Sequence, residues 1–130
     1  AELVGANMNA AVLTRANLSG AELFGTTLAN VSAHNANFSD AQLNAANMAN
    51  GDFSSASFAN AELDGARLSG ASFARANFSG ASLNRADIRG ADLSRATGLT
   101  QAQVSTACGD STTRLPRSLT ARTCTRIIVR

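Results

Sequence analysis

The spacing of large apolar residues restricts the fold of this chain more than any other feature. Counting in fives through residues 3–93, the central residue is Leu, Ile, Met or Phe at eighteen of nineteen places, and only Ala33 departs from this rule. Two residues before each centre lies an Ala, except at Thr26, Val31 and Gly51. The other three positions are mostly small or polar, so each five residues supply one large and one small apolar side chain.

A spacing of five suits neither an α-helix nor a continuous β-strand. On a helix, each step of five residues advances about 500°, so the large residues would spiral over every face. On a strand, an odd spacing would place successive large residues on opposite faces. A short extended piece followed by a turn fits the pattern. Its repetition predicts a coil that has one large inward side chain on each side.

Residues twenty positions apart match in type, which indicates four sides per coil. One predicted column of inward residues consists of Leu3, Leu23, Leu43, Leu63 and Leu83. Another is a ladder that becomes aromatic after its first member, with Leu18, Phe38, Phe58 and Phe78. The small inward Ala has a reason as well, because two side chains per side enter a narrow interior and only one of them can be large.

The individual repeats, such as ANLSG at residues 16–20 and ADLSR at residues 91–95, follow the pattern A-[N/D]-L-x-x. On these residues the chain resembles the pentapeptide-repeat family. The resemblance covers residues 1 to about 97 and implies an all-β fold, a right-handed quadrilateral β-helix of nearly five parallel coils. Neighbouring coils are then expected about 4.8 Å apart, joined by backbone hydrogen bonds.

The repeat pattern ends after Ala96, and the rest of the chain is predicted to form a cap and a tail. Thr100 suits the N-cap of a short helix that reaches Ala107, whose apolar residues would cover the last coil. The string GLTQAQVSTACGDSTTRLP resembles the C-terminal segment of many bacterial pentapeptide-repeat proteins. We therefore divide the chain into a repeat domain, residues 1–97, and a C-terminal cap helix and tail, residues 98–130.

Both cysteines lie in the C-terminal segment. Cys108 and Cys124 enclose fifteen residues, and a disulfide between them would stabilise the fold by about 3 kcal/mol on the chain-entropy model. A tail without a core gains most from such a bridge, which favours it over two reduced thiols. With the bridge, an exported or periplasmic location is expected; with reduced thiols, a cytoplasmic one.

The sequence offers no arrangement of residues suited to catalysis or to a metal ion. His34 is the only histidine and falls at an outward position, and two cysteines with one distant histidine lack the paired spacing of a zinc site. The serines face outward without a neighbouring base. No apolar run approaches the ~18–20 residues of a membrane span. We expect a non-enzymatic protein with no cofactor, no metal and no membrane span.

Charge is distributed unevenly along the chain. Residues 1–66 hold six acids and one Arg, a balance of −5, whereas residues 67–130 hold ten Arg and three Asp, a balance of +7. The repeat register predicts an acidic stripe on one side of the rod, formed by Glu2, Glu22, Glu62 and Asp64. The alternative to a binding role is a set of solvated faces that keep a narrow rod soluble.

These features favour a protein-interaction or structural scaffold rod with a protein partner of unknown identity. Well-characterised members of the family mimic duplex DNA and protect DNA gyrase from quinolones, so the resemblance implies DNA-mimic binding of a type II topoisomerase as the alternative. A third hypothesis is contact between the basic end and phosphates, through Arg85, Arg89, Arg95, Arg114, Arg117, Arg122 and Arg126. The lack of exposed aromatic residues and of a reading helix in that half does not favour nucleic acid as a partner.

Three large apolar residues at the N-terminal end break the rule that outward positions are polar or small. Val4, Val12 and Phe24 face outward in the first coil or just above it. We expect this end to be buried, either in a homodimer or under the chain's own segment Ile127-Ile128-Val129. A trimmed N-terminus is the alternative, since the chain opens at Ala1 instead of Met.

Overall fold

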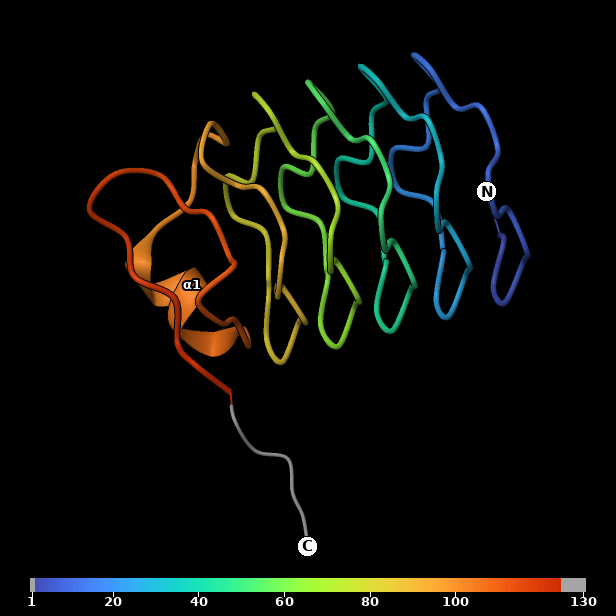
Figure 1. Cartoon of the computed structure of the whole chain (residues 1–130). Coiled ribbons are helices and arrows are strands. Elements are labelled where there is room, and N and C mark those ends of the chain that lie inside the picture. The colour runs from blue at the N-terminus through green and yellow to red at the C-terminus, as the bar shows by residue number, and fades with distance from the viewer. Residues whose placement is uncertain (1, 125–130) are drawn as a thin grey trace, which may run out of the picture.

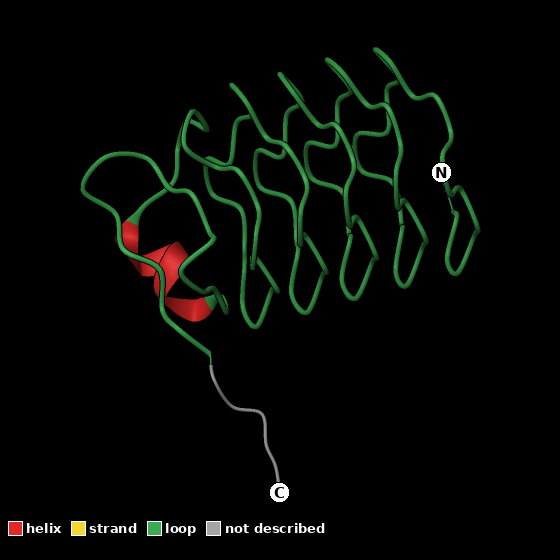
Figure 2. Ribbon diagram, viewed as in Figure 1, coloured by secondary structure: helices red, strands yellow, loops and turns green. Residues whose placement is uncertain are grey.

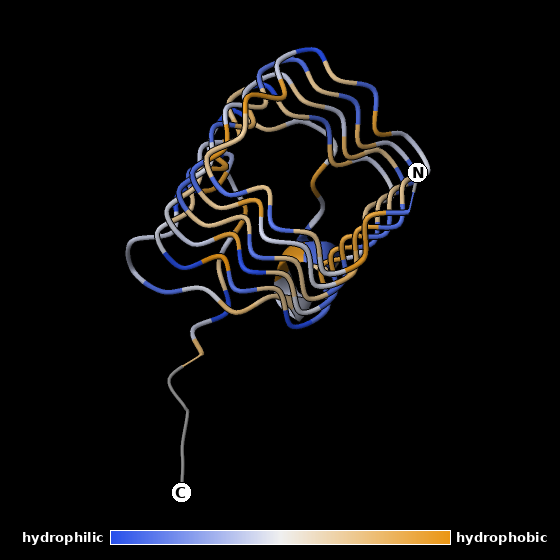
Figure 3. Ribbon diagram, turned by 90° about the vertical axis from the view of Figure 1, so that its right-hand side faces the viewer, coloured by the Kyte–Doolittle hydropathy of each residue, from blue (hydrophilic) through white to orange (hydrophobic). Residues whose placement is uncertain are grey.

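The computed structural model describes residues 2–124, which form a solenoid of stacked coils (Figure 1). Viewed nearly along the stack, each coil has four sides (Figure 3). Parallel bridges join each side to the side twenty residues further on, beginning with Glu2 to Glu22 and Asn7 to Thr27. The predicted right-handed quadrilateral β-helix and its period of twenty are confirmed.

The four sides are named here after their first-coil residues. The first side begins as residues 2–5, the second as 7–10, the third as 12–15 and the fourth as 17–20, and each recurs every twenty residues. Each five-residue repeat begins with its inward Ala. The bridge residue follows and faces outward, the centre enters the core, and the last two residues form the turn.

Backbone hydrogen bonds follow one rule through the first four coils. The N–H of each centre donates to the carbonyl of the bridge residue in the next coil, as from Leu23 to Gln42 at 2.7 Å. The N–H of that bridge residue donates back to the inward Ala of the preceding coil, as from Gln42 to Ala21 at 2.9 Å. Both polar backbone groups of a bridge residue therefore face the N-terminal end of the rod. Since each side contributes a single bridge, Figure 2 shows one helix, α1 (Gln101–Thr106), and otherwise loops and turns.

Two ladders of phenylalanine rings fill the middle of the core. Phe38, Phe58 and Phe78 stack with ring centroids 5.1 and 5.2 Å apart, which confirms the predicted aromatic ladder. A second stack joins Phe53 and Phe73 at 5.4 Å. The two ladders meet edge to face at 5.3–6.0 Å. Each such aromatic pair is worth about 0.5–1.5 kcal/mol beyond area burial, so the ladders tie the central coils together.

Departures from the repeat compensate one another in side-chain volume. Val31 and Ala33 are both buried, so a larger inward residue accompanies the one small centre. In the next coil the exchange is reversed, since the inward residue is the small Gly51 and the centre is the large Phe53. A Cβ on Gly51 would collide with the ring of Phe53. Thr26 replaces Ala for a different reason, since its buried hydroxyl donates to a first-coil carbonyl at 2.9 Å.

The C-terminal end of the rod is covered by α1. Thr100 is its N-cap, as predicted, and exchanges capping hydrogen bonds with Gln103. The side-chain amide of Gln103 donates to the carbonyls of Phe78 and Ala81, at 2.9 Å each. The carbonyl of Ala81 is one that a further coil would otherwise pair, so this side chain takes the place of a coil. Val104, a residue of α1, is fully buried.

After α1 the chain adds two sides of a sixth coil. Cys108 bridges to Asp87, and Arg114 bridges to Asp92. These spacings are 21 and 22 residues, so the period of twenty is broken by short insertions. A last bridge between Gly109 and Thr123 lays the end of the described chain over the sixth coil.

Within residues 2–124, the N-terminal end has no comparable cover. The first-coil centres are only half-buried, whereas every centre from the second coil to the fifth is fully buried. The half-buried centres are Leu3, Met8, Leu13 and Leu18. Among residues 2–124, the last coil is therefore covered by α1, whereas no described residue covers the first coil.

Candidate interaction surfaces

The first side of the rod carries the predicted acidic stripe. Glu2, Glu22, Gln42 and Glu62 stack through consecutive parallel bridges, and the three glutamates are exposed. Asp64 follows on the same side, where its carboxylate accepts hydrogen bonds from the hydroxyl of Ser82 and from a backbone N–H. The structure thus brings the four predicted acidic residues onto one side.

Asp40 extends the acidic stripe beyond the residues that were predicted. It occupies the turn between the fourth and first sides, two residues before Gln42 of the stripe, and it is exposed. The repeat register contained the signal for it, because the last residue of each five lies at a corner and can serve either adjoining side. We call Glu2, Glu22, Asp40, Glu62 and Asp64 the acidic side.

Carboxylates on the opposite, third side are engaged in their own turns. The hydroxyl of Ser54 donates to Asp52 at 2.6 Å, and this bond is the main cause that lowers the pKa of Asp52. Ser94 does the same for Asp92 at 2.7 Å, and it likewise lowers the pKa of that carboxyl. The backbone N–H of each serine adds a second bond at 3.1 Å. These aspartates hold turns, in contrast to the glutamates of the acidic side.

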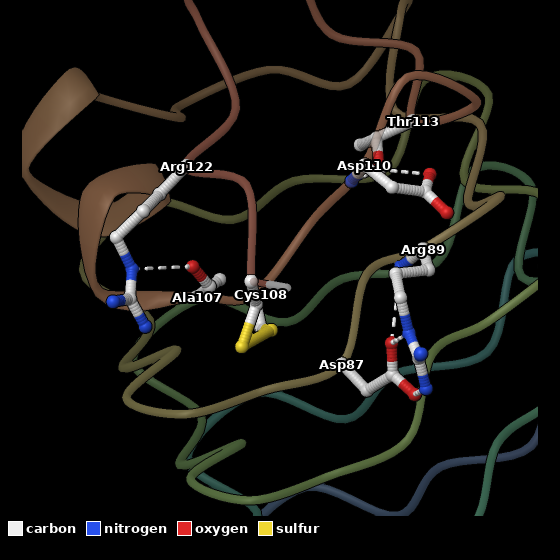
Figure 4. Close-up of a disulfide and its surroundings, with 8 residues drawn as sticks. Asp87, Arg89, Ala107, Cys108, Asp110, Thr113 and Arg122 are labelled. Carbon is white, nitrogen blue, oxygen red and sulfur yellow. Dashed lines mark hydrogen bonds and ion pairs between the residues drawn. A yellow bond between two sulfur atoms is a disulfide. The ribbon is translucent and has the colours of Figure 1, made fainter. Parts of the chain in front are cut away.

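Two of the predicted basic-end arginines make contacts within the chain. Arg89 forms a bidentate ion pair with Asp87, with both hydrogen bonds at 2.8 Å, and this contact lowers the pKa of Asp87 (Figure 4). Arg122 donates to the carbonyl of Ala107 at 3.3 Å. Arg126 lies outside the described residues. The basic end therefore presents fewer free guanidinium groups than the sequence suggested.

The disulfide predicted between Cys108 and Cys124 is present (Figure 4). Its Cα atoms lie 5.0 Å apart. Backbone bonds flank it on both sides, since Gly109 donates to Arg122 at 2.8 Å and the N–H of Cys124 donates to Gly109 at 3.2 Å. The bridge holds the end of the described chain against the sixth coil.

The apolar residues at the N-terminal end are exposed as predicted, at 60% for Val4, 77% for Val12 and 38% for Phe24. Val4 and Phe24 occupy the same place on the first side in consecutive coils. The segment Ile127-Ile128-Val129, proposed as one cover for this end, lies outside the described residues. Burial of the end by a partner stays a prediction.

Two open depressions lie on the described surface. One, of about 570 Å³, is lined by Asp64, Gly65, Asn84, Arg85 and Thr106. Another, of about 550 Å³, lies over the segment from Asp110 to Thr123. Within residues 2–124, no three His, Cys, Asp or Glu side chains are grouped so that they could hold a metal ion. His34 is exposed. No described helix is long and apolar enough to cross a membrane.

Two solved structures with the same architecture come from cyanobacteria. The pentapeptide repeat protein Rfr23 from Cyanothece 51142 is 25% identical, with a TM-score of 0.78 over 88% of this chain and 90% of that protein. The pentapeptide repeat protein alr5209 from Nostoc Pcc 7120 is 27% identical, with a TM-score of 0.66 over 88% of this chain and 77% of that protein.

A more distant likeness is of fold alone. QnrB1, a plasmid-mediated fluoroquinolone resistance protein, is 16% identical, with a TM-score of 0.50 over 85% of this chain and 75% of that protein. None of the curated proteins compared matches the sequence. Residues 1–30, 36–73 and 61–97 match the family of Pentapeptide repeats, in eight copies. With this match over most of the solenoid, the chain belongs to the pentapeptide-repeat family.

Proposed function

We propose that the protein is a non-enzymatic interaction rod whose acidic side binds a basic surface on a protein partner. The observation that carries this proposal is the placement of five carboxylates on one side, with no Arg on that side before Arg85. The glutamates among them are exposed and are not used in turns, unlike Asp52 and Asp92 on the third side. They are therefore available to a partner.

The fold suits contact with an extended partner. Coils about 4.8 Å apart hold the acidic residues at fixed spacings. Binding therefore restricts only the rotamers of these side chains, and little other conformational entropy is lost. A row of like charges on a rigid scaffold attracts a complementary basic surface over a distance of about one Debye length. Binding of this kind weakens as salt is added.

The proposal is tested by capture of partners on the immobilised rod. We expect a bound protein that is released by about 0.5 M salt, since the Debye length is then only a few ångströms. A variant with Glu22→Gln, Glu62→Gln and Asp64→Asn should no longer capture this bound protein. Asp52→Asn, an acid-to-amide change on the third side, serves as the control and should retain it. Equal capture by both variants would remove the acidic side as the contact.

A second candidate is DNA-mimic binding of a type II topoisomerase. The acidic side favours it, but five acids from Glu2 to Asp64 give about one charge per 3 Å of rod, against one per ~1.7 Å of duplex DNA. This lower density makes mimicry the second choice. The test is a gyrase supercoiling assay, with and without quinolone. Protection of the enzyme that is lost in the Glu22→Gln, Glu62→Gln variant supports mimicry, and no effect at any concentration removes it.

We further propose that the protein works outside the reducing cytosol, because a disulfide persists chiefly in oxidising compartments. The bond between Cys108 and Cys124 supports this proposal. Protein recovered from its native cells under rapid alkylation should contain no free thiol. Two alkylated cysteines in that material would place the protein in a reducing compartment instead.

A further inference from the structure

The first side of the rod combines carboxylates with exposed apolar side chains in two neighbouring columns. These columns are Glu2, Glu22, Gln42 and Glu62, and beside them Val4, Phe24, Asn44 and Asp64. Phe24 is 38% exposed, and every other phenylalanine is buried. The first side faces away from the rod axis, so coils stacked before or after it do not cover it. It fits a partner segment that carries an apolar residue between two cations.

The chain itself contains a segment of this kind. Residues 125–130, which lie outside the described part of the chain, have the sequence Thr-Arg-Ile-Ile-Val-Arg. Three consecutive β-branched residues favour an extended strand, and the side chains of a strand alternate between its two faces. One face of that strand carries Arg126, Ile128 and Arg130. This face presents an apolar residue between two cations.

We propose that residues 126–130 of one copy dock as an extended strand along the first side of a second copy, with Ile128 on Phe24. Neighbouring side chains on one face of a strand are about 6.7 Å apart. Arg126 and Arg130 therefore lie at this distance from Ile128, one in each direction along the rod. Since the pattern Arg-x-Ile-x-Arg is the same when it is read backwards, the strand can bind in either direction.

The carboxylates of the first side lie close to the places that the two arginines reach. Glu2 lies one coil spacing, about 4.8 Å, before Phe24 along the rod. Glu62 and Asp64 lie two spacings, about 9.6 Å, beyond Phe24. The arginine positions therefore miss these carboxylates by about 2–3 Å along the rod, which long side chains can span. Each arginine has an acidic partner while the aliphatic residue between them covers the exposed ring.

The contact joins two copies, because the segment cannot reach Phe24 of its own chain. A chain spans at most about 3.6 Å per residue, so Ile128 lies within about 14 Å of Cys124. The disulfide with Cys108 holds Cys124 at the sixth coil. Phe24 belongs to the second coil, which is four coil spacings, or about 19 Å, away.

Two copies can exchange their segments reciprocally. In two antiparallel rods that overlap fully, the sixth coil of one copy lies level with the first coil of the other. A segment that leaves Cys124 then meets the second copy near Glu2 and runs towards Glu62. A two-fold axis repeats the contact and gives a closed dimer. This inference rests on the proposed function, since it names a second copy of the chain as an occupant of the acidic side.

The dimer is tested by sedimentation equilibrium on the 130-residue chain. The wild type should approach twice its 13.3 kDa mass as concentration rises. Ile128→Ser removes the apolar contact and should raise the dimer dissociation constant about tenfold or more, as should Phe24→Ser. Ile127→Ser, on the opposite face of the strand, is the matched control and should change it by less than about threefold. Equal weakening by Ile127→Ser and Ile128→Ser would overturn the docked strand.

Charge exchange tests the two arginines. Arg126→Glu with Arg130→Glu sets like charges together and should raise the dissociation constant about tenfold or more. Adding Glu2→Arg and Glu62→Arg should restore it to within about threefold. Arg117→Glu, which changes an exposed arginine outside the segment, is the control and should leave the dimer intact. A charge reversal that the exchanged pair does not rescue would overturn the ion pairs.

A labelled peptide of residues 122–130, with Cys124→Ser, separates docking from dimerisation. In fluorescence anisotropy it should bind the Ile128→Ser chain, whose first side is intact, and should not bind the Phe24→Ser chain. A chain that stays monomeric at millimolar concentration, or a dimer that is insensitive to Ile128→Ser, overturns this inference. The proposed function stands after either result if the rod still captures a partner that the changes at Glu22, Glu62 and Asp64 release. Failure of the dimer and failure of the proposed function are therefore distinguishable.

Discussion

Val31 and Ala33 fill the third side of the core with their sizes exchanged relative to the usual Ala and Leu. Both are buried. In the next coil, the ring of Phe53 lies over Gly51 and fills the same side. We expect Ala33→Leu to lower the free energy of unfolding by about 1–3 kcal/mol, because the added atoms have no free space. Combining it with Val31→Ala restores the volume, so the double variant should lie within about 1.5 kcal/mol of wild type.

Chemical denaturation of both single variants and the double variant measures this exchange. Val31→Ala alone is the control and should cost roughly 2 kcal/mol through the cavity that it leaves. The double variant should be more stable than the sum of the two single changes predicts. If Ala33→Leu alone were more stable than wild type, the third side would contain an unfilled void and the exchange would be wrong.

Asp52 and Asp92 make stability depend on pH. Hydrogen bonds from Ser54 and Ser94 lower the pKa of each carboxyl below its ordinary value of 3.8. A carboxyl whose pKa is lower in the folded state contributes stability above its unfolded pKa and loses it as pH falls through the folded pKa. The melting temperature should therefore decline as pH falls below about 4.

The serine hydroxyls supply the control for this pH effect. Ser54→Ala with Ser94→Ala should cost ~0.5 kcal/mol per site at pH 7, a small value because these carboxylates are largely exposed. The difference from wild type should shrink as the aspartates are protonated near pH 2. A difference of constant size from pH 7 to pH 2 would mean that the serines stabilise through packing instead.

At the scale of elements, the disulfide holds the end of the described chain on the sixth coil. Reduction should speed the exchange of the amides of Gly109 and Cys124, which bond across residues 109–124. It should leave the first five coils intact, because their hydrogen bonds do not pass through the bridge. Unreduced protein should show no free thiol by alkylation and intact mass. The rod melting together with the tail on reduction would contradict this separation.

The elements differ in how well the sequence predicts them. The ladder of Phe38, Phe58 and Phe78 followed from the period of twenty, and the stack of Phe53 on Phe73 obeys the same spacing and could have been found in the same way. The sixth coil could not, because insertions in the connecting segments remove the register there. The contacts of Gln103 depend on where α1 comes to lie, and no repeat records that position.

The candidate site shows a similar division. The acidic stripe follows from the register, since residues in one column share a side. Which carboxylates are free follows from side-chain length, a weaker clue. An aspartate is short enough to accept the N–H two residues on, as Asp52 does from Ser54, whereas the longer Glu62 extends into solvent. The exposure of Val4, Val12 and Phe24 was predicted from the register, but the direction of the backbone groups in the first coil required the structure.

At the scale of the whole molecule, the rod should tolerate the loss of one complete coil. Deleting residues 41–60 places residues 61–80 on residues 21–40 with every bridge residue still matched to another. The variant should fold with a lower free energy of unfolding, since solenoid stability adds up from neighbouring coils. Circular dichroism and denaturation measure whether the variant folds and how stable it is. Small-angle scattering should give a rod that is about 4.8 Å shorter. Failure to fold would mean that the removed phenylalanines are indispensable.

The pairing of every residue with the one twenty places away has a consequence at the level of the gene. An in-frame gain or loss of twenty codons adds or removes one complete coil and leaves each of the four sides facing the same direction. A change of five codons keeps the alternation of inward Ala and Leu intact, so the variant should still fold and a folding measurement would not reveal the change. It nevertheless turns everything downstream by a quarter of a revolution. Glu62 would then no longer stand above Glu22, and a surface assembled over several coils would be dispersed by a mutation that spares the core.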